Sequence, residues 1–453
     1  MEYIVKTPLG LIKGTNSKNE GVIAFKGIRY AIANRFEYSK LIEKYDDIYD
    51  ATEYKNCSYQ PRSFYNEEEN LKKVFYYNEF RKGEHYSYSE DCLFLNIFKP
   101  KPSKEGDNLP VIVYIHGGGF QGGCAHEKHF DEPVWPLKGV IGVTINYRLG
   151  PLGFMCLEEL KDKDGKIGNY GLYDQVEALK WVKQNISSFG GNPNNVTIMG
   201  QSAGAMSVQQ LVMSPLTKGL FHKAVMSSGG GVSKILSTPK PSKFYEFNRK
   251  VMELTHSKTI DEFKKVPIEI LFQAYEKAKK EVSVFGMVYS PVIDNYLIVD
   301  NGVNIYKNKT YHKIPYMLGS TSEDMMVPFM NSMSRKWGKV QDLNSYIWYF
   351  NHKLPGDNNG AWHSSDLWYF FGTLDNSWRP NTDKDYELSN IMVSYLTNFA
   401  KFGNPNGDGL PLWQSIKESK NKDMHLGNGV YEMKKTNKLQ MYKTMIRNKA
   451  VGE

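Results

Sequence analysis

Short apolar runs alternate with helical patterns along most of this chain. Residues 3–7, 10–14 and 22–25 alternate between apolar and polar positions, as strands with one exposed face do. Later runs are almost continuously apolar, which is typical of strands buried on both faces: 89–98, 111–115, 139–146, 196–199, 223–228 and 314–319. Strands that alternate with helices predict an α/β fold, a mostly parallel sheet flanked by helices.

The helical stretches have the 3.6-residue spacing of an amphipathic helix. Val176, Leu179, Val182 and Ile186 share one face of a helix for which Asp174 is a candidate cap. Other helices are expected over 205–213 and from about 385 to 402. The last residues, 438–453, are expected to form a strand or a helix. Interrupted helical patterns over 236–283 predict a helical insertion, and 37–88 is expected to be a surface loop with short helices.

The sequence GQSAG, residues 200–204, lies between a predicted strand and a predicted helix. A serine at the apex of such a sharp turn needs glycine two positions before and after it, because side chains there would clash. The turn exposes the Ser202 hydroxyl and directs the Ala203 amide toward a developing oxyanion. The alternative is a turn tightened by glycine with a solvated serine.

A second glycine-rich motif, HGGGF at 116–120, follows the predicted buried strand 111–115. Successive glycines allow a loop to approach a ligand and to point its amides inward. The amides of Gly118 and Gly119 are therefore candidates to join that of Ala203 in an oxyanion hole. The alternative is a flexible turn without chemistry.

The composition argues against several classes of partner. The 453 residues carry a net charge of +8, but the lysines are scattered, which indicates a solvated surface and no nucleic-acid partner. No apolar run is long enough to span a membrane, so no membrane partner is expected. The first residues lack the pattern of a secretory signal, which favours a cytoplasmic location.

The four cysteines are Cys57, Cys92, Cys124 and Cys156. None of them has CxxC spacing, so neither a zinc site nor a redox pair is expected. His126 and His129 are close in sequence but have no carboxylate motif beside them, and no metal site is predicted there.

Taken together, the motifs resemble the type-B carboxylesterases, the cholinesterase-like carboxylesterase/lipase family, and in particular bacterial members. The following motifs occur in the family's order: GIRYA, SEDCLFLNIF, HGGGF, NYRLGPLGF, GNYGLYDQ, VTIMGQSAGA, GLFHKAVMSSG, GAWHSSDLWYFFG and NFAKFGNPNG. The resemblance implies a single α/β-hydrolase domain over 1–453, with 236–283 as a cap-like helical insertion. It also implies a carboxylic ester hydrolase that acts on a small-molecule ester without a cofactor.

The resemblance also suggests site residues. Ser202 would be the nucleophile, His363 the general base and Asp324 the acid, with Glu323 as its competitor. Gly118, Gly119 and Ala203 would form the oxyanion hole. His116 is expected to brace the glycine loop, and His222 to have a structural role.

Other features follow from comparison with the family pattern. Arg35 with Glu90, and Arg148 with Asp174, are implied to be structural ion pairs. Gln201 stands where many members carry glutamate, so a negative charge is missing and a cationic substrate loses a reason to bind. The expected substrates are short- to medium-chain neutral esters. Cys57 and Cys92 lie where many secreted members have a disulfide, and are expected here to be free thiols.

The largest departure is the spacing between Asp324 and His363. The two are 39 positions apart, fewer than is usual in the family, because a helical segment after the acid is missing. That loss would open the site or misplace the triad, so the alternative is a catalytically impaired or non-catalytic binding protein on the same fold. The sequence leaves the natural ester and the oligomeric state open.

Overall fold

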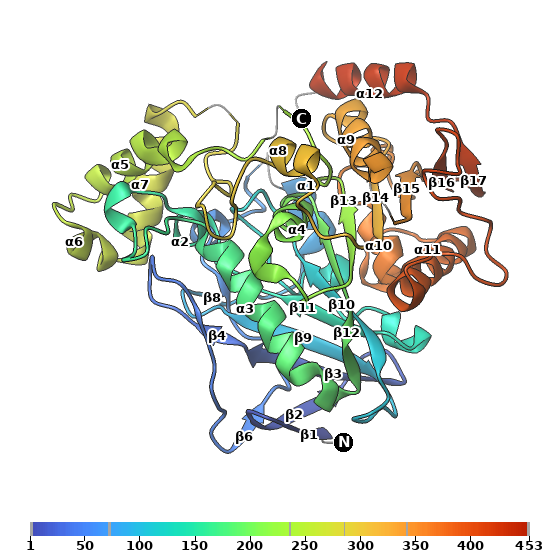
Figure 1. Cartoon of the computed structure of the whole chain (residues 1–453), viewed down its shortest axis with the longest axis horizontal. Coiled ribbons are helices and arrows are strands. Elements are labelled where there is room, and N and C mark those ends of the chain that lie inside the picture. Colours follow the sequence, from blue (N-terminus) through green and yellow to red (C-terminus); the bar gives the residue numbers. More distant parts are fainter. Residues whose placement is uncertain (1–2, 71–73, 235–236, 285, 341–342, 451–453) are drawn as a thin grey trace.

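A large sheet with parallel central strands runs through the molecule (Figure 1). The computed structural model describes residues 3–70, 74–234, 237–284, 286–340 and 343–450. The strands follow the order β1-β2-β3-β9-β11-β10-β12-β13-β14-β15-β16-β17, and β6 pairs with β2. Their bounds are Tyr3–Thr7 (β1), Gly10–Asn16 (β2), Val22–Arg29 (β3), Ile48–Asp50 (β6), Phe94–Pro100 (β9), Leu109–Ile115 (β10), Ile141–Ile145 (β11), Gly191–Gln201 (β12), Lys223–Ser227 (β13), Tyr316–Thr321 (β14), Ser345–Phe350 (β15), Asp423–Gly427 (β16) and Val430–Lys434 (β17).

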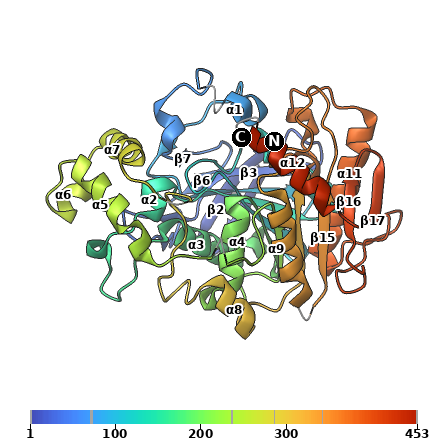
Figure 2. The same cartoon turned by 90° about the horizontal axis from the view of Figure 1, so that it is seen from above.

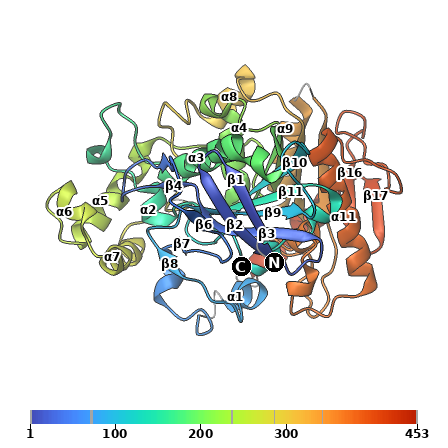
Figure 3. The same ribbon diagram turned by 90° about the horizontal axis from the view of Figure 1, so that it is seen from below.

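Parallel pairing holds from β11 through β16, and antiparallel strands complete both ends. The helices are Val74–Phe80 (α1), Gly150–Phe154 (α2), Tyr170–Asn185 (α3), Ala203–Met213 (α4), Tyr245–Leu254 (α5), Ile260–Lys264 (α6), Ile268–Glu281 (α7), Gly302–Asn308 (α8), Val327–Val340 (α9), Asp366–Phe371 (α10), Asp383–Phe402 (α11) and Lys438–Ala450 (α12). In Figure 3, strands β1, β2 and β6 lie together at one end of the sheet, where β1 is antiparallel and β6 parallel to β2.

Alternate side chains of the central strand β10 enter two different cores. Val111, Val113 and Ile115 pack in the core that α3 and α4 cover. Ile112 and Tyr114 point the other way, into the core of α10 and α11. Because both faces are buried, the strand is apolar throughout. The α/β fold predicted from the alternation of elements is confirmed.

Two predictions about local structure are wrong. The strand expected over 89–98 begins only at Phe94, because Glu90 and Asp91 are held by the side chains of Arg35 and Arg29. Asp174 does not cap its helix, because α3 begins one turn earlier, at Tyr170. Asp174 is thus an interior residue of α3, and its side chain is buried in the protein.

The helices α5, α6 and α7 stand together at one end of the molecule (Figures 1 and 2). The ring of Phe263 in α6 stacks on Phe36 at 5.2 Å between ring centres. The Tyr275 hydroxyl in α7 donates a hydrogen bond to Gln121, which directly follows the HGGGF motif. This helical insertion therefore contacts the loop that carries the candidate oxyanion amides.

The helices expected over 205–213 and about 385–402 are present and 438–450 is a helix, whereas 451–453 lie outside the described residues. α11 ends in the NFAKFG motif, and the last described segment is the helix α12, which lies against α9 (Figure 2). The described residues of 37–88, which exclude 71–73, form only short elements, among them α1, β6 and the two-residue strands Lys40–Leu41 (β5), Cys57–Ser58 (β7) and Tyr88–Ser89 (β8). Among the described residues, no helix combines the length and the apolar character that crossing a bilayer requires.

Candidate active site

Ser202 occupies the single residue between β12 and α4. Its backbone torsions, φ 55° and ψ −125°, lie in a region that residues other than glycine rarely adopt. The Ser202 amide donates to the Ser227 carbonyl at the end of β13, at 2.9 Å, which holds the strained turn in place. The side chain is half-buried, so the hydroxyl can be reached from outside.

The two glycines of the GQSAG turn are required by close contact. A Cβ atom on Gly200 would lie 2.4 Å from the backbone of Gly204. A Cβ atom on Gly204 would lie 2.0 Å from the carbonyl oxygen of Ile115, at the end of β10. Only glycine lets helix α4 start this close to the sheet, as the motif predicts.

His363 and Asp324 form a buried hydrogen-bonded pair. Nδ1 of His363 lies 2.5 Å from Oδ1 of Asp324, which follows β14, and Oδ1 also accepts the Met325 amide at 2.8 Å. Glu323 has a different position: its amide donates to the Ala361 carbonyl at 2.9 Å, which fixes the loop before the histidine. The Asp324 carboxylate therefore orients His363 in this structure.

The side chain of Gln201 contacts the other ring nitrogen of the histidine. Nε2 of Gln201 lies 3.1 Å from Nε2 of His363. An amide nitrogen can only donate, so His363 Nε2 accepts and its proton resides on Nδ1, facing Asp324. This is the tautomer that a general base for Ser202 requires. In the sequence Gln201 is recognisable only as a missing charge, and nothing there predicts this contact.

Asp366, three residues after His363, was also missed. Its carboxylate is fully buried and accepts a hydrogen bond from the Ser227 hydroxyl at 2.7 Å. Burial, together with the charge of the nearby Asp324, raises the pKa of Asp366 to about 6, although the hydrogen bond from Ser227 lowers it. In the sequence, Asp366 is noticeable only as a single acid directly before the apolar run LWYFF. Only the fold shows that it lies under the site.

The glycine loop is braced from several sides. Gly118 and Gly119 have φ of 108° and 63°, and the Gly118 carbonyl accepts the amide of Gly122 at 3.0 Å. Nδ1 of His116 lies 2.8 Å from the Gly117 carbonyl, and burial lowers the pKa of His116 to about 4, so the neutral ring braces the loop as predicted.

The third candidate amide belongs to Ala203, the first residue of α4. An amide in the first turn of a helix has no acceptor within that helix. It is therefore available, at the positive end of the helix dipole, to an anion formed at Ser202.

The contacts confirm the predictions about the two ion pairs, His222 and the cysteines. Arg35 Nε donates to Glu90 at 2.9 Å, and the buried Arg148 binds both Asp174 oxygens at 2.7 and 2.8 Å. Nδ1 of His222 accepts the Val196 amide at 3.2 Å, which is a structural role. All four cysteines are free thiols, Cys57 and Cys92 included.

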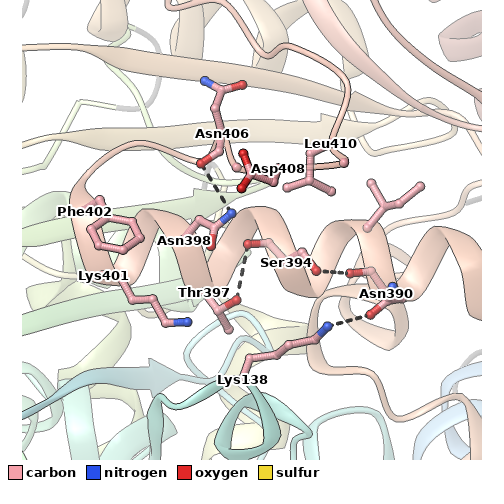
Figure 4. Close-up of a pocket in the computed structure, with 13 residues that line it drawn as sticks. Lys138, Asn390, Ser394, Thr397, Asn398, Lys401, Phe402, Asn406, Asp408 and Leu410 are labelled. Carbon is pink, nitrogen blue, oxygen red and sulfur yellow. Dashed lines mark hydrogen bonds between the residues drawn. The ribbon is translucent and has the colours of Figure 1, made fainter.

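A polar groove elsewhere on the surface does not belong to this site (Figure 4). It lies along α11, and its polar groups bond to one another, as in the contacts of Lys138 with Asn390 and of Asn398 with Asn406. The carbonyl of Lys401, a lining residue, accepts from Asn195 in the first half of β12, whereas Ser202 follows the end of that strand. The second half of the strand therefore lies between this side of the groove and the nucleophile.

The fold and the turn that carries Ser202 define the chain as an α/β-hydrolase. The Carboxylesterase family matches residues 1–353 and 327–445, and the chain belongs to it. The two matches overlap in 327–353. These residues follow Asp324 and belong to the segment that is shorter in this chain than is usual in the family. The chain is a carboxylic ester hydrolase.

Individual relatives agree with this assignment. Para-nitrobenzyl esterase of Bacillus subtilis is 30% identical over 478 aligned positions, covering 92% of this chain and 93% of the relative. Human cocaine esterase is 29% identical, covering 80% of this chain and 77% of its own length. A solved structure titled PNB esterase superimposes with a TM-score of 0.83 at 27% identity, covering 98% of this chain and 99% of the other.

Proposed function

We propose that the protein is a serine carboxylesterase that hydrolyses short- to medium-chain neutral esters through an acyl-enzyme. The observation that carries the proposal is the 2.5 Å hydrogen bond between His363 and Asp324. It forms across only 39 positions, so the missing helical segment does not prevent the acid from reaching the histidine. This argues against the alternative of an impaired or non-catalytic binding protein.

In the proposed reaction, Ser202 Oγ attacks the ester carbonyl while His363 Nε2 takes the hydroxyl proton. The carbonyl oxygen becomes an oxyanion, which the amides of Gly118, Gly119 and Ala203 would bind. His363 returns the proton to the departing alcohol, and Asp324 stabilises the imidazolium meanwhile. Water then attacks the acyl-enzyme by the same proton transfers. The hydrogen bond from Gln201 to Nε2 of His363 must break before that nitrogen can accept the Ser202 proton.

The chemistry around the site supports a neutral substrate. The residue before the nucleophile is an uncharged amide, so nothing there attracts a cationic alcohol. Met325 and Met326, directly after the acid, are 56% and 42% exposed and offer an apolar rim. The helical insertion α5–α7 reaches the glycine loop through Tyr275 and Gln121, and we propose that it acts as a cap that limits acyl length.

The test is hydrolysis of p-nitrophenyl acetate, butyrate and octanoate by the wild type, Ser202→Ala and a matched surface variant, Ser188→Ala. Wild type and Ser188→Ala should turn over acetate and butyrate faster than octanoate, and Ser202→Ala should be inactive. Equal activity of wild type and Ser202→Ala would contradict the nucleophile. An inactive, folded wild type would favour the binding alternative.

We also propose a cytoplasmic location, which four buried free thiols support, since thiols persist in reducing compartments. Fractionation of the source cells, with the protein detected by antibody, tests it. Recovery outside the cytoplasm would contradict the proposal.

A further inference from the structure

The fold brings together two cysteines and a histidine that are far apart or unremarkable in the sequence. Cys57 lies in β7, and Cys124 and His126 follow the glycine loop. Their ligand atoms, two sulfurs and one ring nitrogen, all lie within 4.8 Å of one another. Sγ of Cys57 is 3.9 Å from Nε2 of His126, and both cysteines are fully buried.

The His126 ring is held in a fixed orientation. It stacks on Tyr54 with ring centres 4.3 Å apart and planes 4° from parallel, and Tyr86 packs beside it at 5.3 Å. A histidine ring held in one orientation beside two thiols is a preorganised metal ligand.

Two side chains near the cluster have buried hydrogen-bond donors without an acceptor. Tyr86 packs beside the His126 ring, and the Arg62 guanidinium lies 5.9 Å from the centre of the Tyr86 ring. Within the described residues, the Tyr86 hydroxyl and the Nε and Nη2 of Arg62 have no hydrogen-bond partner, although Arg62 Nη1 donates to Glu127 at 2.6 Å. Buried donors are normally satisfied, so these unpaired donors are available to the sulfurs of metal-bound cysteines.

We propose that Cys57, Cys124 and His126 form a binding site for a thiophilic metal ion, with Zn²⁺ as the expected ion. On binding, the two S–H bonds break, two Zn–S bonds and one Zn–N bond form, and two protons pass to solvent. Zn²⁺ neutralises the two thiolates, which suits a buried site. Zn–S and Zn–N distances of about 2.3 and 2.0 Å require only small movements from the observed separations.

The site lies behind the candidate oxyanion loop. Gln60, three residues after Cys57, already clamps Gly123: its Oε1 accepts the Gly123 amide at 3.0 Å and its Nε2 donates to the Gly123 carbonyl at 3.2 Å. A metal ion between Cys57 and Cys124 would add a second clamp one residue further along. We therefore expect the bound ion to stabilise the fold around this loop, without taking part in ester hydrolysis.

Cobalt binding to the full-length protein tests the proposal. The reduced, chelator-treated protein is titrated with Co²⁺, whose bonds to thiolate give a charge-transfer absorption in the near ultraviolet. Wild type should bind one Co²⁺ per chain with this band, and Zn²⁺ should displace the cobalt and raise the melting temperature. Cys156→Ser, which removes a buried free thiol elsewhere, should behave like wild type.

Cys57→Ser/Cys124→Ser and His126→Asn should each weaken cobalt binding at least about tenfold. Circular dichroism and hydrolysis of p-nitrophenyl butyrate report whether each variant is folded, and His126→Asn keeps both thiols if the double variant does not fold. No thiolate–cobalt band in wild type, or an equal band in folded variants, would overturn the site. A Cys57–Cys124 disulfide found by peptide mass spectrometry in the unreduced protein would also overturn the site. Binding of Cu⁺ but not Zn²⁺ would overturn the assignment of zinc as the ion.

Discussion

Nε2 of Gln201 lies 3.1 Å from Nε2 of His363, so the residue before the nucleophile occupies the lone pair that the nucleophile needs. The contact fixes the ring in the tautomer of a general base. It also competes with the Ser202 hydroxyl for the same nitrogen. Whatever charge stands at position 201 therefore acts directly on the protonation of His363.

The first prediction concerns Gln201→Glu. A carboxylate about 3 Å from His363 Nε2 favours the protonated ring, so the histidine pKa should rise by about one unit or more. The base form then appears only at higher pH, and the acid limb of kcat/KM against pH should move upward accordingly. Gln201→Met, which removes the hydrogen bond without adding charge, is the control. An unmoved acid limb in Gln201→Glu would show that residue 201 does not influence the base.

The second prediction separates the two neighbouring acids. Asp324→Asn removes the charge that accepts from His363 Nδ1, and kcat should fall by about three to four orders of magnitude, as for a triad whose histidine loses its orienting carboxylate. Glu323→Gln keeps the backbone bond to Ala361, so its kcat should stay within a few fold of wild type. Steady-state kinetics of both variants with p-nitrophenyl butyrate check this. The reverse ranking would make Glu323 the acid.

The third prediction follows from the raised pKa of Asp366, about 6 when folded against an unfolded value of about 3.9. The folded state binds this proton more tightly, so ionisation destabilises the fold increasingly from about pH 4 to pH 6. Asp366→Asn cannot ionise. Its free energy of unfolding relative to wild type should therefore rise by up to about 3 kcal/mol between pH 4 and pH 7.

Urea unfolding at several pH values, followed by circular dichroism, measures this difference. Comparison across pH cancels any constant effect of the amide at position 366. Parallel stability curves for the two proteins would mean that the carboxyl is not abnormally protonated in the fold.

The fourth prediction compares a buried and an exposed ion pair. Arg148 and Asp174 side chains are 3% and 0% exposed, so Asp174→Asn leaves a buried guanidinium without its charge partner and should cost about 3–5 kcal/mol. Arg29 and Asp91 are 28% and 51% exposed, and Asp91→Asn should cost less than about 1 kcal/mol. Chemical denaturation of both variants gives the two values, and similar losses would contradict the distinction.

The fifth prediction concerns the turn that carries the nucleophile. A methyl group in Gly204→Ala would meet the Ile115 carbonyl at 2.0 Å, so α4 must shift away from β10 and carry Ser202 with it. A displacement near 1 Å should lower kcat/KM by about 100-fold. Gly302→Ala, where a Cβ meets only the flexible end of Met213, is the matched control and should keep its activity. Full activity in Gly204→Ala would show that the turn tolerates a side chain.

The sequence by itself determined the fold class and the nucleophile turn. Continuous apolar strands such as 111–115 are informative because burial on both faces leaves no polar position, and a glycine-serine-glycine turn is informative because its sterics are local. The pairing of Arg148 with Asp174 followed from the family resemblance. The prediction that Asp174 caps a helix was wrong. A carboxylate that precedes an apolar helical stretch has the same local pattern whether it caps the helix or pairs with a buried arginine.

Only the tertiary structure decided which distant groups meet. It brought Asp324 to His363 across a shortened segment, placed the Gln201 amide on the histidine, and buried Asp366 beneath them. It also set Cys57 beside Cys124 and His126, although their spacing predicts no such cluster. The physical reason is that these contacts depend on where separate strands and loops end in space, and residue types along one segment do not encode that position.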